Sequence, residues 1–269
     1  MESKHRFISY DGTELEGTLM PCQSAGDTLV LMVHGITSSR DEFGLFSGLA
    51  ANLAQERIPS FRFDYRCHGI STIPMEQMTL TGIVNDIEAA ANCSMGLTNK
   101  ASVFIVGMSF GGGLSAFWAA STLRPVRGIV MFAPVIDYEE DLLGKDGVVD
   151  GVITKQPYRM ELEAKGFVEV EGVRYGRALL GEMPYINGIE GIKRANCDLL
   201  IVHGDSDSVV PFNSSERFAK LNSRCQLVNI AGTDHGFGVD GDEDLTWPET
   251  KAKHHEVFQL VSDFINGRE

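Results

Sequence analysis

Short apolar runs alternate along the chain with longer stretches in which apolar and polar residues recur at helical spacing. The apolar runs lie at 28–33, 59–63, 101–106, 128–132, 198–202 and 225–230. They are too short for helices and do not alternate with polar residues, as is typical of parallel strands covered on both faces. The helical stretches between and after them lie at 43–56, 81–94, 112–122, 214–221 and 255–266. This alternation predicts a mostly parallel sheet with right-handed crossovers.

The beginning of the chain has a different pattern. Two strand-like segments, 6–10 and 14–20, flank Asp11-Gly12, a dipeptide that favours a tight hairpin turn. We therefore expect the sheet to begin with an antiparallel pair and to contain eight strands in all.

One interval interrupts the alternation. About sixty residues, 135–194, separate Pro134 from the next predicted strand, whereas a plain crossover needs about a dozen. They are rich in glycine, tyrosine and acidic residues. We interpret 135–194 as a lid inserted over an active site, with 1–134 and 195–269 forming the core. The alternative is a surface excursion that does not touch the substrate.

Composition narrows the class of protein. A chain of 269 residues suits a single α/β domain with a lid. No apolar stretch approaches the length of about 18 residues that a membrane span needs, and no apolar segment follows the basic residues near the N-terminus. We expect neither a membrane span nor a secretory signal. The net charge of -14 would repel phosphate backbones, so nucleic acid is not an expected partner.

The five cysteines are an odd number and contain no Cys-x-x-Cys spacing. This usage is typical of reduced thiols and predicts a cytoplasmic protein. Clustered histidines and cysteines at metal-ligand spacing are missing from the sequence, so we expect no metal and no cofactor. The cysteines are Cys22, Cys67, Cys93, Cys197 and Cys225.

The pattern Gly-x-Ser-x-Gly occurs once in a suggestive position. Ser109 stands between Gly107 and Gly111, directly after the apolar run 103–106 and before a small-residue stretch, 112–116, that can open a helix. A strand, a tight turn and a helix in this order form a nucleophile elbow, which exposes the serine hydroxyl above the sheet edge. A hydroxyl is a weak nucleophile, so it needs an imidazole to take its proton and a carboxylate to orient that imidazole.

Two later loops provide both groups. The loop 203–211 follows one predicted strand and carries Asp205 and Asp207, and the loop 231–237 follows the next strand and carries His235. Because the carboxyl ends of parallel strands meet at one edge of a sheet, these loops are expected to approach the elbow. The order serine, aspartate, histidine is the one that α/β-hydrolases use.

In these segments the chain resembles the α/β-hydrolase superfamily, and within it the small esterases and acyl hydrolases of the cinnamoyl-esterase and serine-peptidase-like kind. The resemblance spans nearly the whole chain and includes a strand followed by His34-Gly35-Ile36. It implies an eight-stranded α/β-hydrolase fold with helices on both faces. It also implies an oxyanion hole formed by the backbone N–H groups of Ile36 and Phe110.

The resemblance also implies which carboxylate orients the histidine. The family pattern His-Gly-x-x-Asp-x-x-Val-Pro places that role on Asp207, with Asp205 as the alternative. Asp234, the neighbour of His235, is interpreted as a loop carboxylate that caps its own turn or stays solvated.

Other residues near these motifs are interpreted as structural. His34 and His203 are expected to support their loops by hydrogen bonding. The segment 64–69 resembles the family's Asp-x-Arg-x-x-Gly turn, in which the aspartate and arginine brace loops. Among the aromatic side chains of the lid, Tyr138 and Tyr158 are the candidates for substrate contact. Phe167 and Tyr175 are further aromatic residues of the lid.

The sequence and the resemblance together predict a serine hydrolase of the carboxylesterase type, acting on a small-molecule ester through a Ser109–His235–Asp207 triad and an acyl-enzyme. An acyl thioesterase and an aminoacyl or acylaminoacyl peptidase of the same fold remain alternatives. A non-catalytic hydrolase-fold protein that binds a ligand is an alternative of a different class. The acyl and alcohol groups stay open at this point, as does a homodimer.

Overall fold

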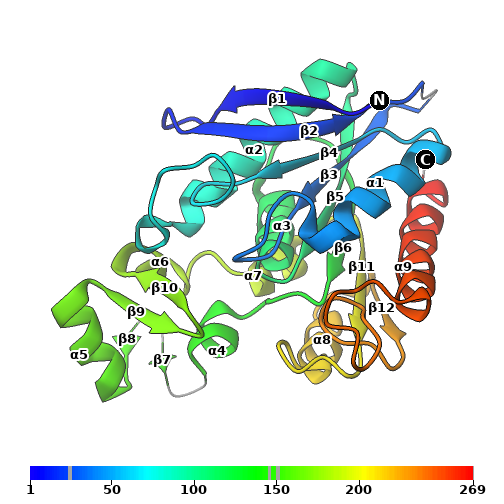
Figure 1. Cartoon of the computed structure of the whole chain (residues 1–269). Helices are drawn as coiled ribbons and strands as arrows, with labels where there is room; N and C mark the ends of the chain where they lie inside the picture. Colours follow the sequence, from blue (N-terminus) through cyan, green and yellow to red (C-terminus); the bar gives the residue numbers. More distant parts are fainter. Residues whose placement is uncertain (24–25, 145–146, 150–151, 269) are drawn as a thin grey trace.

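The computed structural model describes residues 1–23, 26–144, 147–149 and 152–268, which are built around an eight-stranded sheet (Figure 1). Across the sheet the strand order is β1-β2-β4-β3-β5-β6-β11-β12. The β1–β2 and β2–β4 pairs are antiparallel, and every other pair is parallel. The predicted mostly parallel sheet and its initial hairpin are confirmed. The strands are β1 (Ser3–Ile8), β2 (Glu14–Met20), β3 (Thr28–Val33), β4 (Ser60–Asp64), β5 (Ser102–Met108), β6 (Val126–Phe132), β11 (Asp198–Gly204) and β12 (Cys225–Ile230).

Helices cover both faces of the sheet. Strand β3 explains why the apolar runs do not alternate, since Leu29 and Leu31 join the core on one face while Val30 and Met32 join the core on the other. All four side chains are fully buried. The first face is covered by α2 (Leu80–Thr98), α3 (Phe110–Ser121), α7 (Gly188–Arg194) and α8 (Phe212–Ala219), and the second by α1 (Leu45–Gln55) and α9 (Pro248–Asn266).

The segment between β6 and β11 forms an insertion that projects to one side of the sheet in Figure 1. Its apolar side chains, among them Val168, Leu179 and Leu180, continue the core of the α2–α3 face, so the insertion is packed onto the domain. Its last helix, α7, approaches α3 so closely that a Cβ at Gly191 would lie 2.4 Å from the backbone of Ala116. The other elements are α4 (Tyr138–Leu143), β7 (Val148–Val149), β8 (Val152–Ile153), α5 (Gln156–Lys165), β9 (Phe167–Val170), β10 (Val173–Gly176) and α6 (Arg177–Glu182).

Two short 3₁₀ helices lie in loops after the carboxyl ends of β3 and β4. These are η1 (Glu42–Gly44), which precedes α1, and η2 (Met75–Gln77), which packs against β10 of the insertion. The carboxyl ends of the parallel strands lie at one edge of the sheet, where open α/β sheets bind their ligands. The segments that follow β3, β5, β6, β11 and β12 can therefore build a site together.

A buried ion pair ties this edge to the first hairpin. Arg66, just after β4, donates through Nε and Nη2 to the two carboxylate oxygens of Asp86 on α2, at 2.9 and 2.8 Å. The side chain of Asp86 is 0% exposed. Arg66 also donates through Nη1 to Asp11 in the hairpin loop, at 2.8 Å. Three segments distant in sequence are thus joined by one guanidinium, in agreement with the bracing role expected for the 64–69 turn.

Within the part of the chain that the structure describes, no helix combines the length and the apolar composition needed to cross a bilayer. The same residues contain no group of three or more His, Cys, Asp or Glu side chains placed to hold a metal ion. All five cysteine thiols are free and partly buried.

Candidate active site

Ser109 occupies a strained turn between β5 and α3. Its φ of 50° and ψ of -120° form a combination that L-residues rarely adopt. The backbone is held there by the end of β6, because the N–H of Ser109 donates to the carbonyl of Phe132 at 2.8 Å and the N–H of Val135 donates to the carbonyl of Ser109 at 3.0 Å. This geometry presents the serine side chain to a cavity at the sheet edge.

The two glycines of the motif are required by close backbone contacts. A Cβ at Gly107 would lie 2.4 Å from Oγ of Ser115, and a Cβ at Gly111 would lie 2.3 Å from the carbonyl oxygen of His34. Any side chain at these positions would force α3 away from β3 and β5. The spacing Gly-x-Ser-x-Gly therefore reflects the close approach of α3 to the sheet that the turn at Ser109 requires.

Asp207 and His235 form a hydrogen-bonded pair beside this turn. Nδ1 of His235 lies 2.7 Å from Oδ2 of Asp207, whose side chain is 0% exposed. The other carboxylate oxygen accepts the N–H groups of Val209 and Val210, at 2.8 and 2.9 Å. Burial by itself would raise the pKa of Asp207, but hydrogen bonds from His203 and His235 outweigh it and hold this pKa well below its usual range. Asp207 is therefore ionised.

His203 makes a contact at this site that the sequence did not predict. Its buried ring places Nε2 at 2.9 Å from Oδ2 of Asp207, the same oxygen that His235 contacts. An ionised carboxylate only accepts, so Nε2 of His203 carries the proton, and Nδ1 then accepts from the hydroxyl of Ser215 at 2.7 Å. The expected supporting role of His203 thus acts directly on Asp207. The sequence signal for this contact is the motif His-Gly-x-x-Asp, in which His203 precedes Asp207 by four residues.

The competing carboxylates face elsewhere. Asp205 is exposed and accepts from the side chain of Asn229 and the N–H of Gly232, at 2.9 and 2.7 Å. Asp234 accepts the N–H groups of Gly236 and Gly238 within its own turn, at 2.9 and 2.7 Å. Asp207 is the carboxylate that lies against His235.

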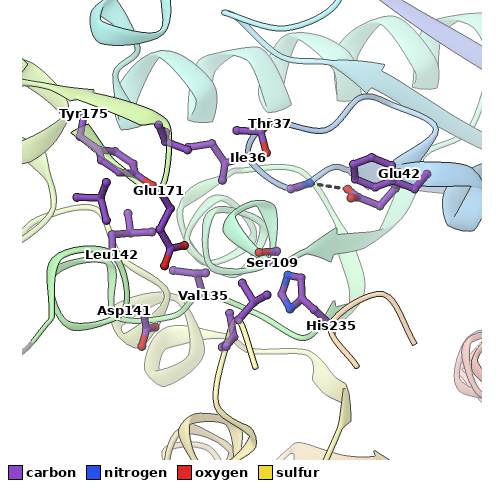
Figure 2. A pocket seen from close by; sticks show the side chains of 16 residues that line it. Ile36, Thr37, Glu42, Ser109, Val135, Asp141, Leu142, Glu171, Tyr175 and His235 are labelled. Carbon is purple, nitrogen blue, oxygen red and sulfur yellow. Dashed lines mark hydrogen bonds between the residues drawn. The ribbon is translucent and has the colours of Figure 1, made fainter. Parts of the chain in front are cut away.

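Ser109 and His235 line the same cavity, and Figure 2 shows the imidazole ring beside the serine side chain. No hydrogen bond joins the hydroxyl to the ring in the described structure. In hydrolases without a bound substrate this contact is commonly loose and tightens in the substrate complex. The structure thus brings the three sequence-predicted side chains to one edge of the sheet.

The turn after β3 forms the opposite wall of the cavity. Nδ1 of His34 lies 2.7 Å from the carbonyl oxygen of Gly35, and the ring of His34 is stacked on Tyr65 with 4.0 Å between centroids. Burial lowers the pKa of His34 well below its usual value, so the ring is neutral and supports the turn as the sequence suggested. Among the described residues, the N–H groups of Ile36 and Phe110 have no hydrogen-bond partner. Ile36 lines the cavity, and Phe110 directly follows Ser109.

The cavity has a volume of about 310 Å³ and a mixed lining. Its apolar wall comes mainly from the insertion and from the loop after β11. In Figure 2 His235 lies beside Ser109, whereas Asp141 and Glu171 lie on the side of the insertion. A hollow that combines apolar walls with a few polar groups is the usual form of a small-molecule site. The apolar lining residues are Ile36, Phe43, Val135, Leu142, Val170, Val173, Val209 and Val210.

Comparisons with known proteins agree with this fold. Residues 25–158 match the model of a family described as serine aminopeptidase, S33. Among solved structures, Est1E from Butyrivibrio proteoclasticus with ferulic acid bound shares 21% identity, with a TM-score of 0.73 over 95% of this chain and 99% of that chain. Alpha/beta hydrolase domain-containing protein 10 from mouse shares 16% identity, with a TM-score of 0.78 over 99% of this chain and 100% of that chain.

This chain belongs to the α/β-hydrolase superfamily. An esterase from Exiguobacterium antarcticum is a further structural neighbour, at 17% identity and a TM-score of 0.67 over 97% of this chain and 98% of that chain. A comparison with curated proteins finds no match.

The tyrosines in the insertion of this α/β-hydrolase lie differently from the expectation. Tyr138 is fully buried, and its hydroxyl donates to the carbonyl of Phe110 at 2.7 Å, so it supports the first turn of α3. Tyr158 is half-buried against the core, with Nζ of Lys155 over its ring at 5.5 Å. Neither lines the cavity, whereas Tyr175 of β10 does. Of these three tyrosines, Tyr175 is therefore the one placed to meet a molecule in the cavity.

The polar lining of the hydrolase cavity is acidic. Glu42, Asp141 and Glu171 contribute to its wall, and no lysine or arginine is among the described lining residues. Figure 2 shows the carboxylate of Glu171, from the β9–β10 turn, reaching into the cavity. Burial, opposed by backbone hydrogen bonds, raises the pKa of Asp141 to about 6. Near neutral pH the cavity therefore carries negative charge.

Proposed function

We propose that this α/β-hydrolase is a serine hydrolase that cleaves carboxylic esters through an acyl-enzyme intermediate. Ser109 is the nucleophile, His235 the general base and acid, and Asp207 the group that orients the imidazole. One observation carries the proposal: a serine on a strained elbow shares a cavity with a histidine whose Nδ1 is bonded to a buried, ionised aspartate. The likeness to Est1E, which is described with ferulic acid bound, supports an ester as the substrate.

Acylation follows from the hydrogen-bond directions. Because Nδ1–H of His235 donates to Asp207, Nε2 carries the lone pair and can take the hydroxyl proton of Ser109. The serine Oγ then bonds to the carbonyl carbon, and the carbonyl oxygen becomes an oxyanion held by the N–H groups of Ile36 and Phe110. Collapse of this intermediate breaks the bond to the alcohol oxygen, which receives the proton from His235.

Deacylation repeats the same steps with water. His235 takes a proton from water, the resulting hydroxide oxygen attacks the acyl carbon, and the acid leaves as Oγ of Ser109 recovers its proton. Asp207 stays ionised throughout and stabilises the imidazolium that forms in each half-reaction. The cycle therefore consumes one ester and one water and regenerates the enzyme.

The proposal is tested with an active-site-directed reagent together with a panel of chromogenic esters. We expect a fluorophosphonate to label the protein at Ser109, as found by peptide mass spectrometry, and we expect short-chain 4-nitrophenyl esters to be hydrolysed. Unlabelled protein without turnover would instead identify a hydrolase-fold ligand-binding protein. Matched thioesters and aminoacyl anilides in the same panel distinguish the acyl thioesterase and the peptidase.

The acidic lining favours one of these alternatives as a second candidate function. A substrate with a free ammonium group, such as an aminoacyl ester or anilide, would place its positive charge near Glu171 and Asp141. The family description of a serine aminopeptidase fits such a substrate. We infer that aminoacyl compounds are the second class of substrate that this cavity fits, after neutral esters.

The charge of the cavity leads to a prediction that does not depend on the exact substrate. Butyryl esters whose chains end in sulfonate, methyl or trimethylammonium should differ in kcat/KM, with the sulfonate ester about tenfold slower than the neutral one because like charges repel across the cavity. Below the pKa of Asp141, about 6, this carboxylate becomes neutral, so the ratio of neutral to sulfonate rates should shrink as the pH falls.

Glu171→Gln should also reduce that ratio, because it removes one charge without changing the shape of the side chain. Glu163→Gln provides the matched control, since Glu163 lies on α5 outside the cavity lining. If the unsubstituted protein hydrolysed the sulfonate, methyl and trimethylammonium esters at equal rates, the carboxylates would not influence the bound acyl chain.

A further inference from the structure

Glu42 is a carboxylate at the active-site cavity that the proposed reaction does not use. The residue is only 6% exposed, yet it lines the same cavity as Ser109 and His235. In Figure 2 its side chain points toward the turn after β3, and a hydrogen bond joins it to that turn. Burial of a carboxylate costs free energy, so a buried acidic side chain that takes no part in the reaction requires a physical explanation.

The backbone around Glu42 is strained. Glu42, Phe43 and Gly44 have φ angles of 44°, 51° and 94°, three successive left-handed residues of which only one is glycine. Non-glycine residues adopt this region rarely, and they persist in it where the surrounding structure requires it. Burial also raises the pKa of Glu42, against the effect of its hydrogen bond. Both features cost stability, and clusters of such costs are typical of functional sites.

These two costs maintain a contact between Glu42 and the turn after β3, which carries the N–H of Ile36. The N–H of Gly35 donates to Oε2 of Glu42 at 2.6 Å. The carbonyl of the same glycine accepts from Nδ1 of His34 at 2.7 Å. Gly35 is therefore held from both sides, by a carboxylate on its N–H and by an imidazole on its carbonyl.

This double restraint sets the direction of the next amide. The carbonyl of Gly35 and the N–H of Ile36 belong to one planar trans peptide group, in which the two bonds point in opposite directions. Because His34 holds the carbonyl, the N–H of Ile36 points the other way, and this N–H has no partner among the described residues.

The close packing at Gly35 explains why the carboxylate can reach the turn. A Cβ built on Gly35 would lie 3.6 Å from both carboxylate oxygens of Glu42 and 3.3 Å from Cβ of Ser109. Glu42, the turn and the nucleophile are thus in successive contact. A shift of the carboxylate would be transmitted to the turn that faces the serine.

We propose that Glu42 is a positioning residue, which accepts the Gly35 N–H and thereby holds the Ile36 amide in line for the oxyanion. This inference rests on the proposed function. Glu42 acts through the turn and does not touch the reacting atoms. The role requires a hydrogen-bond acceptor at this place and does not require its negative charge.

Two substitutions separate the acceptor from the charge. Glu42→Gln retains an acceptor oxygen of the same reach, whereas Glu42→Ala removes it. We expect Glu42→Ala to lower kcat about 30-fold with KM changed less than threefold, because loss of a whole oxyanion donor costs about 100-fold to 1000-fold. Glu42→Gln should restore kcat to within about threefold of the parent enzyme. The amide proton of Gly35, followed by ¹⁵N–¹H NMR, should move upfield in the alanine variant alone.

The matched control is Asp41→Ala. Asp41 precedes Glu42 in the same loop, does not line the cavity and pairs with Arg62 at 2.8 Å. Asp41→Ala should retain the kcat of the parent enzyme and its amide proton chemical shift at Gly35. Thermal melts report whether each variant is folded. The proposal is overturned if folded Glu42→Ala keeps its kcat or its Gly35 shift, or if Glu42→Gln loses as much as Glu42→Ala. If the parent protein did not hydrolyse esters, the proposed function would be contradicted. The chemical shift of the Gly35 amide proton would still test the hydrogen bond to Glu42.

Discussion

Ser109→Ala is expected to abolish ester turnover while leaving the protein folded. The proposed reaction has no other nucleophile, and loss of the serine from a triad lowers kcat by roughly 10⁶-fold. The fold should survive because the backbone of the elbow is held by hydrogen bonds to Phe132 and Val135, which do not involve the side chain. The measurement is the initial rate with a 4-nitrophenyl ester, together with a thermal melt followed by circular dichroism.

Ser115→Ala is the matched control for this experiment. Ser115 lies on the same helix, is buried, and its hydroxyl has no hydrogen-bond partner in the described part of the protein. Its removal should leave the rate within about twofold, because no hydrogen bond is lost. A Ser109→Ala protein that hydrolyses the ester at the parent rate would disprove the assignment of the nucleophile.

Asp86→Ala is expected to destabilise the protein by about 3–5 kcal/mol. The substitution removes both acceptors from Nε and Nη2 of Arg66 and leaves a guanidinium that is almost fully buried without its main counter-charge. The cost arises from this unpaired charge more than from the lost attraction. Urea unfolding should show a lower midpoint with an unchanged m-value.

Asp11→Ala removes a carboxylate from the same arginine at its exposed end. The side chain of Asp11 is 47% exposed, so its hydrogen bond to Nη1 of Arg66 competes with water. Its loss should cost about 1 kcal/mol or less. If Asp86→Ala proved no more destabilising than Asp11→Ala, burial would not be the source of the effect.

Much of the fold could be predicted because its signals are local. The run 198–202 became part of β11 (Asp198–Gly204), and the run 101–106 became part of β5 (Ser102–Met108). Both strands are covered on both faces, so apolar residues occupy consecutive positions and mark the strand without any knowledge of its neighbours. The glycine spacing around Ser109 is equally local, since it reflects contacts between β5 and the first turn of α3.

The insertion between β6 and β11 shows where local signals end. Its length and composition distinguish it from a plain crossover, but the sequence did not show which of its tyrosines faces the cavity. Tyr175 does so because β10 pairs with β9 in a hairpin that lies over the site, and strand geometry puts Val173 and Tyr175 on the same face. Tyr138 lies under α3 because α4 begins directly beside the elbow.

The sequence by itself determined the succession of the core strands and helices along the chain, the elbow serine, and the aspartate and histidine that follow later strands, because each depends on residues adjacent in the chain. The tertiary structure alone decided that one oxygen of Asp207 receives hydrogen bonds from both His203 and His235, and that Glu42 holds the N–H of Gly35. Those contacts depend on where side chains of separate loops meet after the sheet has formed. The burial and hydrogen bonding of these side chains arise only when the separate loops pack together at the edge of the sheet.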